Sequence, residues 1–273
     1  MLIYPPQKHS TSSSSIFFIG SAQDFCRING KDIELINGNF APIFKLEAQL
    51  NRFSIDIDGE TQELEITRTE QEQQSLSEFK QYSGTKLSQV IQKICLDPGH
   101  GGSQAGTCSP KGIKEKDLNL SLAKKLADKL TEAGFEVILT RTEDQDLGLK
   151  ERVDIARDFN SDLFLSIHHN AIPDHLDPAQ EQGISAHYYY NHSQGLAAQL
   201  TEYLSVKLEM NNKSAIQQDL HVTRENDFCQ AILLECGYLI HPVESERISS
   251  KEFQEQISQE ICQFFTQINA KNF

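Results

Sequence analysis

Hydrophobic and polar residues alternate in short runs along the first part of the chain, with turn signals between the runs. Between residues 15 and 68 apolar side chains recur at about every second position, which is typical of strands with one buried face. Asn29-Gly30 and Asn37-Gly38 follow two of the runs, and Asn-Gly favours a two-residue hairpin turn. The pattern predicts a small all-β sandwich. Its expected strands are 16–19, 26–30, 33–36, 43–46, 52–57 and 64–66.

The pattern changes near Leu87, and from there strand-like runs alternate with helix-like stripes. The clearest stripe is a set of leucines spaced four residues apart from Leu118 to Leu130, and Gly134 follows it where a helix would end. Strands that alternate with helices predict a three-layer α/β domain with a mainly parallel sheet covered on both faces. The expected strands are 94–96, 135–140, 163–167, 184–190 and 231–234, and the expected helices are 118–130, 149–159, 196–208 and 253–265.

These two patterns divide the chain into four segments. Residues 1–14 end in a run of Ser and Thr and are expected to be a flexible tail, and residues 15–68 form the accessory β domain. Residues 69–91 are the expected linker, and residues 92–273 the α/β domain. No signal peptide is visible at the N-terminus, and no apolar run reaches the roughly 18 residues that a transmembrane helix needs.

Net charge argues against one class of partner, and cysteine usage indicates where the chain is synthesised. The formal net charge is −14, whereas nucleic acid binding needs clustered Lys and Arg, so we expect no nucleic acid partner. The chain has 6 cysteines without Cys-x-x-Cys spacing, most of them in apolar strand or helix patterns. This usage indicates buried, reduced thiols and synthesis in the cytosol.

The segment Asp97-Pro98-Gly99-His100-Gly101-Gly102 is the most informative part of the chain. It follows an apolar run directly, and the carboxyl ends of strands are where α/β sheets place their chemistry. Glycines on both sides of His100 permit positive φ angles and leave the imidazole open. A neutral imidazole in such a place is a good metal ligand.

Three further polar side chains fall at strand ends or at a helix start, namely Glu115, His168 and Glu235. Because the carboxyl ends of parallel strands share one sheet edge, these residues are expected to converge on His100. Two His and one Glu make the ligand set of a catalytic zinc, and a second carboxylate would serve as general base. Each residue also has an ordinary structural explanation, so spacing alone leaves both interpretations open.

Four segments carry these residues in an order typical of one enzyme family. They are ICLDPGHGG, KGIKEKDLNLSLAKKLADKLTEAGFEVILTRTED, LKERVDIARDFNSDLFLSIHHNA and AILLECGYLIHPVE. Together they resemble the zinc-dependent N-acetylmuramoyl-L-alanine amidases, which cut the bond between the lactyl group of muramic acid and the peptidoglycan stem peptide. The resemblance implies that His100, Glu115 and His168 bind one zinc ion per chain and that Glu235 is the catalytic carboxylate. It also implies peptidoglycan as substrate and the cell wall or periplasm as the site of action.

Other residues near these segments carry weaker expectations. Arg224 is the candidate to stabilise the oxyanion or to hold a stem-peptide carboxylate, with a surface arginine as the alternative. His169 could compete with His168 for metal, but one step along a strand turns a side chain to the other face. Residues 171–182 are too few for the long inhibitory helix that some family members carry there. The remaining histidines are expected to be structural or solvated, with His187 or His221 possible only as support around the metal. These are His175, His187, His192, His221 and His241, of which His221 falls in an expected strand before Arg224.

Two other functions stay open at this point. A zinc carboxypeptidase or endopeptidase acting on stem peptides would share the metal but cut between amino acids. An inactive binding protein would use the β domain, which resembles Ig-like modules of secreted bacterial proteins, to dock onto the wall or a partner. The route to the wall also stays open between an unrecognised export signal, an upstream start and action after lysis. We expect a monomer.

Overall fold

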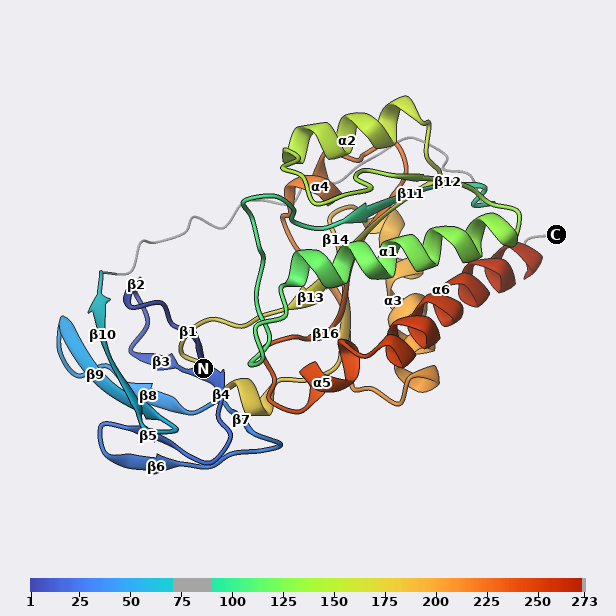
Figure 1. Cartoon of the computed structure of the whole chain (residues 1–273). Coiled ribbons are helices and arrows are strands. Elements are labelled where there is room, and N and C mark those ends of the chain that lie inside the picture. Colours follow the sequence, from blue (N-terminus) through green and yellow to red (C-terminus); the bar gives the residue numbers. More distant parts are fainter. Residues whose placement is uncertain (71–89, 272–273) are drawn as a thin grey trace.

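The computed structural model describes residues 1–70 and 90–271. The chain forms an N-terminal β region, coloured blue in Figure 1, and a larger α/β region. None of the helices in the described part of the chain is both long and apolar enough to cross a membrane. All cysteines are free thiols, and all but Cys108 are buried, as the sequence predicts.

The β region consists of three small sheets around one apolar core. Its strands are β1 (Leu2–Tyr4), β2 (Lys8–Thr11), β3 (Ser15–Phe17), β4 (Ile19–Ser21), β5 (Cys26–Ile28), β6 (Lys31–Ile33), β7 (Asn39–Phe40), β8 (Ile43–Lys45), β9 (Leu50–Ile57) and β10 (Glu60–Arg68). The sheet orders are β1-β4-β7, β2-β10-β9-β5-β6 and β3-β8. Phe18, Phe53 and Ile55 lie in the shared core, where aromatic rings meet edge to face.

The hairpin turn forms where the sequence predicts it, but residues 1–14 contain two strands where a flexible tail was expected. Asn29 and Gly30 have φ angles of 51° and 76° between β5 and β6, as a type I′ turn requires. The tail prediction was wrong, because β1 pairs with β4 and β2 pairs in parallel with β10. β2 is a polar edge strand and shows no apolar alternation that a pattern search could detect. Most of the expected linker, residues 71–89, lies outside the described residues.

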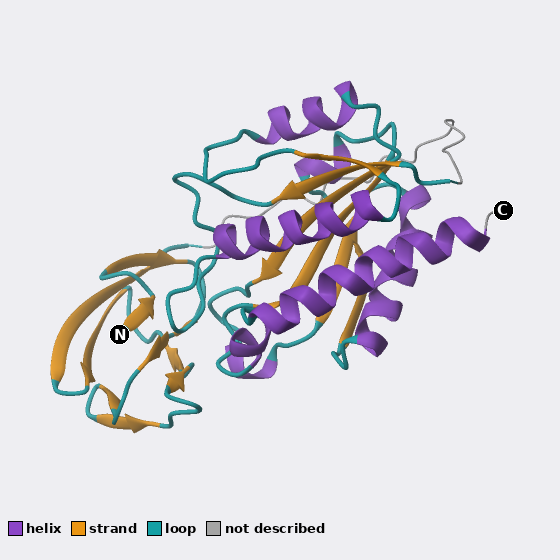
Figure 2. Ribbon diagram, turned by 45° about the vertical axis from the view of Figure 1, so that its right-hand side comes forward, coloured by secondary structure: helices purple, strands orange, loops and turns teal. Residues whose placement is uncertain are grey.

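The α/β region is built on a sheet of order β12-β11-β13-β16-β14-β15. Figure 2 shows helices on both sides of it. Neighbouring strands are parallel except for the pair β14 and β16, so the prediction of a mainly parallel, doubly covered sheet is confirmed. The strands are β11 (Lys93–Pro98), β12 (Glu136–Leu139), β13 (Leu163–Asn170), β14 (Ile184–Tyr188), β15 (Asn212–Gln217) and β16 (Gln230–Tyr238). The helices are α1 (Glu115–Glu132), α2 (Leu149–Asp158), α3 (Asn191–Lys207), α4 (His221–Arg224), α5 (Glu244–Ile248) and α6 (Lys251–Lys271), with a 3-10 turn at Pro178–Gln180.

Side-chain alternation along the central strands decides which residues reach the site. In β13, Leu165 and Ile167 join the large core with α1, α3 and α6, whereas Phe164 joins the smaller core with α2 and α4. By the same alternation His168 lies on the Phe164 side, and Glu235 is its partner in register on β16. The two side chains therefore lie next to each other at the carboxyl end of the sheet.

Two local predictions need correction. The strand expected around His221 is the short helix α4, because a single helical turn is too short to show a helical period. β15 was not expected, since this edge strand is largely exposed and lacks an apolar face.

Candidate metal centre

His100 is held at the end of β11 by two buried arginines. Its own φ angle is 60°, a conformation that a non-glycine residue keeps only when its surroundings enforce it. Arg152 donates from Nη2 to the carbonyl of His100 at 2.8 Å and from Nη1 to Asp97 Oδ1 at 2.7 Å. Arg141 donates from Nη2 to the carbonyl of Gly99 at 2.9 Å. The backbone that carries the imidazole is therefore fixed by charged hydrogen bonds.

Glu115, the first residue of α1, is oriented by hydrogen bonds from three sides. The amide of Thr107 donates to Oε2 at 2.9 Å, and the amide of His169 donates to Oε1 at 3.2 Å. Asn119 donates from Nδ2 to Oε1 at 3.3 Å and is fully buried. Asn119 was missed in the sequence, although its place four residues after Glu115 puts both on one helix face.

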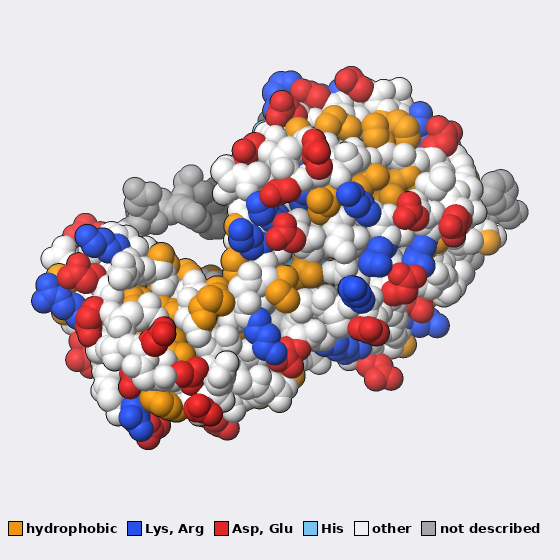
Figure 3. All heavy atoms as spheres, viewed as in Figure 1, with side chains coloured by type: hydrophobic (Ala, Val, Ile, Leu, Met, Phe, Trp, Pro, Cys, Tyr) orange, Lys and Arg blue, Asp and Glu red, His pale blue; other side chains and the backbone are white. Residues whose placement is uncertain are grey.

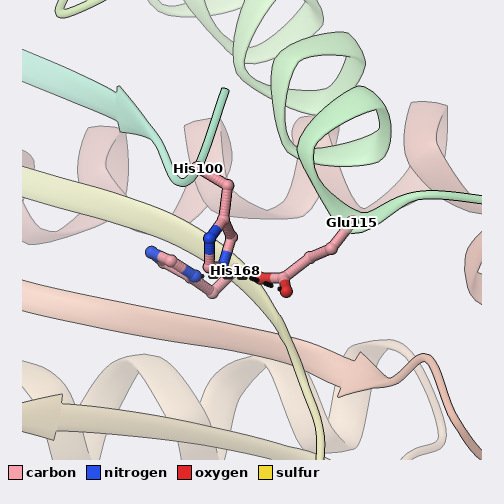
Figure 4. Close-up of side chains that lie close together, drawn as sticks. All are labelled: His100, Glu115 and His168. Carbon is pink, nitrogen blue, oxygen red and sulfur yellow. Dashed lines mark hydrogen bonds and ion pairs between the residues drawn. The ribbon is translucent and has the colours of Figure 1, made fainter. Parts of the chain in front are cut away.

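Three predicted side chains meet at one point. His100 Nε2 lies 3.1 Å from Glu115 Oε2, and His168 Nδ1 lies 2.9 Å from Glu115 Oε1. One nitrogen or oxygen from each of the three lies within 4.8 Å of the others. Figure 4 shows the two imidazoles and the carboxylate pointing toward each other from β11, β13 and α1.

This donor set fits a zinc ion. Burial opposes ionisation of Glu115, but its hydrogen bonds with His100 and His168 outweigh that effect and hold its pKa well below the ordinary value. The carboxylate is thus in the form that binds metal, and imidazole with carboxylate is a common zinc ligand set. His168 lies in β13 and His100 follows the end of the neighbouring strand β11 by two residues, so the pairing of these strands sets their spacing.

Glu235 lies beside His168 but outside the cluster of His100, Glu115 and His168. On β16 it is in register with His168 on one side and with Ser185 of β14 on the other. Its Oε2 is buried and has no hydrogen-bond partner among the described residues. Burial, and then the charge of Glu115, raise the pKa of Glu235 well above its ordinary value. A buried, unpaired carboxyl oxygen is costly for stability.

Arg224 is engaged with acidic neighbours. Its Nε donates to Glu225 Oε1 at 2.9 Å, and its Nη1 pairs with Asp219. A cavity of about 220 Å³ opens beside this cluster, and His221 lines it together with His100 and His168. Of the two histidines expected as possible support, His221 lines this cavity, and His187 lies on β14 two residues beyond Ser185, the partner of Glu235 in register. The role predicted for Arg224 stays a prediction.

The other histidines are placed as expected. His169 points away from the cluster, is buried, and its Nδ1 lies 2.8 Å from Asn119 Oδ1. His192 and His241 are bonded to backbone carbonyl oxygens, and His175 is exposed. Between β13 and β14 the described loop holds a single 3-10 turn, as its length predicted.

Fold and site together define an α/β domain with a candidate catalytic metal centre at the carboxyl edge of its sheet. Residues 94–267 match the model of the N-acetylmuramoyl-L-alanine amidase family. The chain therefore belongs to this family, as its sequence segments indicate.

Several known proteins are similar to the chain. It is 33% identical over 170 residues to the probable cell wall amidase LytH of Staphylococcus aureus, which covers 62% of this chain and 55% of that protein. A solved amidase from Clostridium difficile 630 shares 33% identity with a TM-score of 0.60, covering 65% of this chain and 95% of that one. The CwlD amidase of Clostridioides difficile, solved in complex with the GerS lipoprotein, shares 28% identity with a TM-score of 0.61 and coverages of 66% and 99%. The chain spans about half the length of the curated relatives it matches.

Proposed function

We propose that this protein is a zinc-dependent N-acetylmuramoyl-L-alanine amidase that acts on peptidoglycan in the cell wall or periplasm. It would hydrolyse the amide bond between the lactyl group of N-acetylmuramic acid and L-alanine. The convergence of His100, Glu115 and His168 beside Glu235 carries this proposal, because the set combines three metal ligands with a separate proton acceptor. LytH, a relative, is described as a probable cell wall amidase.

In this proposal each residue has one task. His100, Glu115 and His168 hold one zinc ion, which when bound activates water and polarises the amide carbonyl. Glu235 accepts a proton from the attacking water and delivers it to the nitrogen of the departing L-alanine. The water oxygen forms a bond to the carbonyl carbon and the carbon–nitrogen bond breaks. The products are a lactyl carboxylate and a stem peptide with a free amino group.

Arg224 is proposed to bind a stem-peptide carboxylate or the developing oxyanion. For this its guanidinium must release Asp219 or Glu225, both of which now neutralise it. Replacement of Arg224 by Ala is expected to raise KM if it binds a carboxylate and to lower kcat if it contacts the oxyanion. Unchanged kinetics would assign the residue to the surface alone.

Digestion of purified peptidoglycan, with and without a zinc chelator, tests the reaction. Free stem peptides that begin with L-alanine, detected by mass spectrometry and formed only with zinc present, are the expected result. Shortened stems still attached to sugar would indicate a carboxypeptidase or endopeptidase. The absence of any soluble product would favour a binding protein.

The variant Glu235→Gln separates metal binding from catalysis. It is expected to keep one zinc per chain by elemental analysis, because Glu235 is outside the ligand cluster. Turnover is expected to fall by at least about 100-fold, since a positioned proton acceptor contributes that much. Glu132→Gln, exposed at the end of α1, is the matched control and should keep its activity. Zinc loss in Glu235→Gln would instead assign Glu235 to the metal.

A further inference from the structure

The β region is fixed against the site edge of the α/β region by apolar contacts. Phe17 and Ile19 form one buried cluster with Tyr238 and Ile240, which lie at and just beyond the end of β16. Tyr238 is only three residues from the proposed proton acceptor. Figure 3 shows apolar side chains on both sides of the junction between the two regions. This contact places the β region next to the proposed active site.

Polar contacts fix the same junction at two further places. Asn39, fully buried, donates from Nδ2 to the carbonyl of Pro242 at 2.8 Å and to Glu246 Oε1 at 3.1 Å. At the other place Tyr4 donates to Asp174, whose second carboxylate oxygen lies 3.2 Å from His9 Nε2. Buried polar groups of this kind are costly unless their geometry is kept. The β region is therefore held in one orientation.

A cavity of about 250 Å³ lies between these contacts and takes its lining from both regions. We call it the interdomain cavity. Its walls include Ile3 and Phe17 of the β region, and Gly106, Thr107 and Ile172 of the α/β region.

The wall of this cavity directly contacts the metal ligands. The amide of Thr107 donates to Glu115 Oε2 at 2.9 Å. A Cβ atom added at Gly106 would lie 2.4 Å from Glu115 Oε2 and 2.7 Å from His100 Cδ2. Ile172 follows shortly after His168, in the loop that leaves β13. An occupant of the cavity thus lies against the Gly106–Thr107 segment that contacts Glu115 and His100.

The lining of the cavity selects the chemistry of its occupant. Most of its side chains are alkyl or aromatic, and the carboxylate of Asp174 is already taken by Tyr4 and His9. Sugar hydroxyls would lose hydrogen bonds to water there without gaining partners. A free carboxylate would lie beside an acid with no cation in the lining. Alkyl groups of the stem peptide need neither hydrogen-bond partners nor a cation, so they fit this lining.

We propose that the interdomain cavity is a substrate subsite that takes an alkyl portion of the stem peptide. The β region is then a fixed wall of the active site, and it contributes to substrate recognition without acting as a separate wall-binding module. This inference rests on the proposed amidase function.

Filling the cavity from each side tests the subsite. Ile3→Trp fills it from the β region and Ile172→Trp from the α/β region; neither side chain is fully buried, so both variants are expected to fold. Each should raise KM for peptidoglycan fragments at least about tenfold with kcat and zinc content unchanged, because uniform binding is lost. Leu50→Trp, exposed on β9 of the same region, is the matched control and should behave as the unmodified chain. Unchanged KM in both filled variants would overturn the proposal, as would an equal rise in the control.

A binding measurement keeps this outcome separate from the amidase reaction. In the Glu235→Gln background, calorimetry with a muramoyl tetrapeptide should give a Kd at least about tenfold weaker when Ile3 or Ile172 is replaced by Trp. If the unmodified chain fails to cut but this difference appears, the proposed reaction is wrong and the subsite stands. If the chain cuts and the filled variants bind as tightly as Glu235→Gln alone, the reaction stands and the subsite is wrong. No binding of the fragment in any background would also overturn the subsite.

Discussion

Arg152 donates a hydrogen bond from Nη2 to the backbone carbonyl of His100 at 2.8 Å. The same guanidinium pairs with Asp97 at 2.7 Å, and both side chains are buried. Asp97 also accepts hydrogen bonds from Ser166 at 2.7 Å and from Thr140 at 2.6 Å. A buried ion pair therefore joins β11, β13 and the residue that follows β12 to the backbone of a proposed metal ligand. The ion pair links the stability of the sheet to the geometry of the metal centre.

Replacement of Arg152 by Ala is expected to lower both stability and zinc affinity. Loss of one partner leaves Asp97 buried and unpaired, which typically costs about 3–5 kcal/mol in the free energy of unfolding. The strained φ angle of His100 also loses a supporting contact. Urea unfolding and zinc titration measure the two effects. Arg157→Ala, an exposed position on the same helix, should cost less than about 1 kcal/mol. Zinc affinity that is equal in Arg152→Ala and the unmodified chain would remove Arg152 from the support of the site.

Gly99 gives the ring of His168 the space it needs. A Cβ atom at this position would lie 2.2 Å from both Nε2 and Cε1 of His168, which no real contact allows. Gly99→Ala is expected to displace the imidazole and weaken zinc binding at least about tenfold, as faults around a metal ligand do. Gly195→Ala in α3 meets nothing within 4 Å and should stabilise the helix by about 0.5–1 kcal/mol. Isothermal titration with zinc distinguishes the two. Equal zinc affinity in both variants would contradict this role of Gly99.

Zinc removal is expected to lower the melting temperature without unfolding the protein. His100 and His168 are already held by Glu115, and large apolar cores lie on both sides of the sheet. Zinc at about 1,000 times its Kd should add about 4 kcal/mol to the free energy of unfolding. Calorimetric melting with zinc and with chelator measures the shift. The shift should vanish in His100→Ala and persist in His175→Ala, whose side chain is exposed. A zinc-dependent shift of full size in His100→Ala would place the metal elsewhere.

The clustering of the three proposed metal ligands could be predicted from the sequence because each stands where an element begins or ends. His100 and His168 follow apolar runs, and Glu115 precedes a leucine stripe, so one sheet edge collects them. The supporting contacts of Arg141 and Arg152 could not be predicted, because both arginines bond to backbone carbonyl oxygens from other elements. Every residue has a backbone carbonyl group, so the sequence does not indicate which of them will accept a hydrogen bond from an arginine.

The fold shows the same division between periodic and non-periodic segments. Strands with buried faces and long helices were predicted well, because the regular spacing of apolar residues indicates which face of an element is buried. The polar strand β2, the exposed strand β15 and the single turn α4 have no such period. The junction between the two regions depends on contacts between residues far apart in the sequence, such as Tyr4 with Asp174. A local pattern does not indicate such contacts.

Glu244 is a partly buried carboxyl outside the proposed metal centre whose ionisation affects folding. It accepts hydrogen bonds from the amide of Tyr238 at 2.8 Å and from the amide of Gly183 at 3.0 Å. Burial raises its pKa from the ordinary 4.5 to about 7, against the opposing effect of these hydrogen bonds. The folded state therefore binds a proton in a pH range where the unfolded chain has lost it.

Because the pKa of Glu244 is higher in the folded state than in the unfolded chain, the free energy of unfolding depends on pH. The stabilising contribution of protonated Glu244 is complete below pH 4.5, decreases as the pH rises to about 7 and changes no further above it. The loss amounts to about 3 kcal/mol in the free energy of unfolding. Glu244→Gln cannot ionise, so its stability relative to the unmodified chain should improve by that amount between pH 4.5 and pH 8 in urea unfolding with chelator present. Glu132→Gln, exposed at the end of α1, should show a difference of less than about 0.5 kcal/mol. A relative stability of Glu244→Gln that does not depend on pH would show that the two amide hydrogen bonds fully compensate burial and keep the carboxylate ionised.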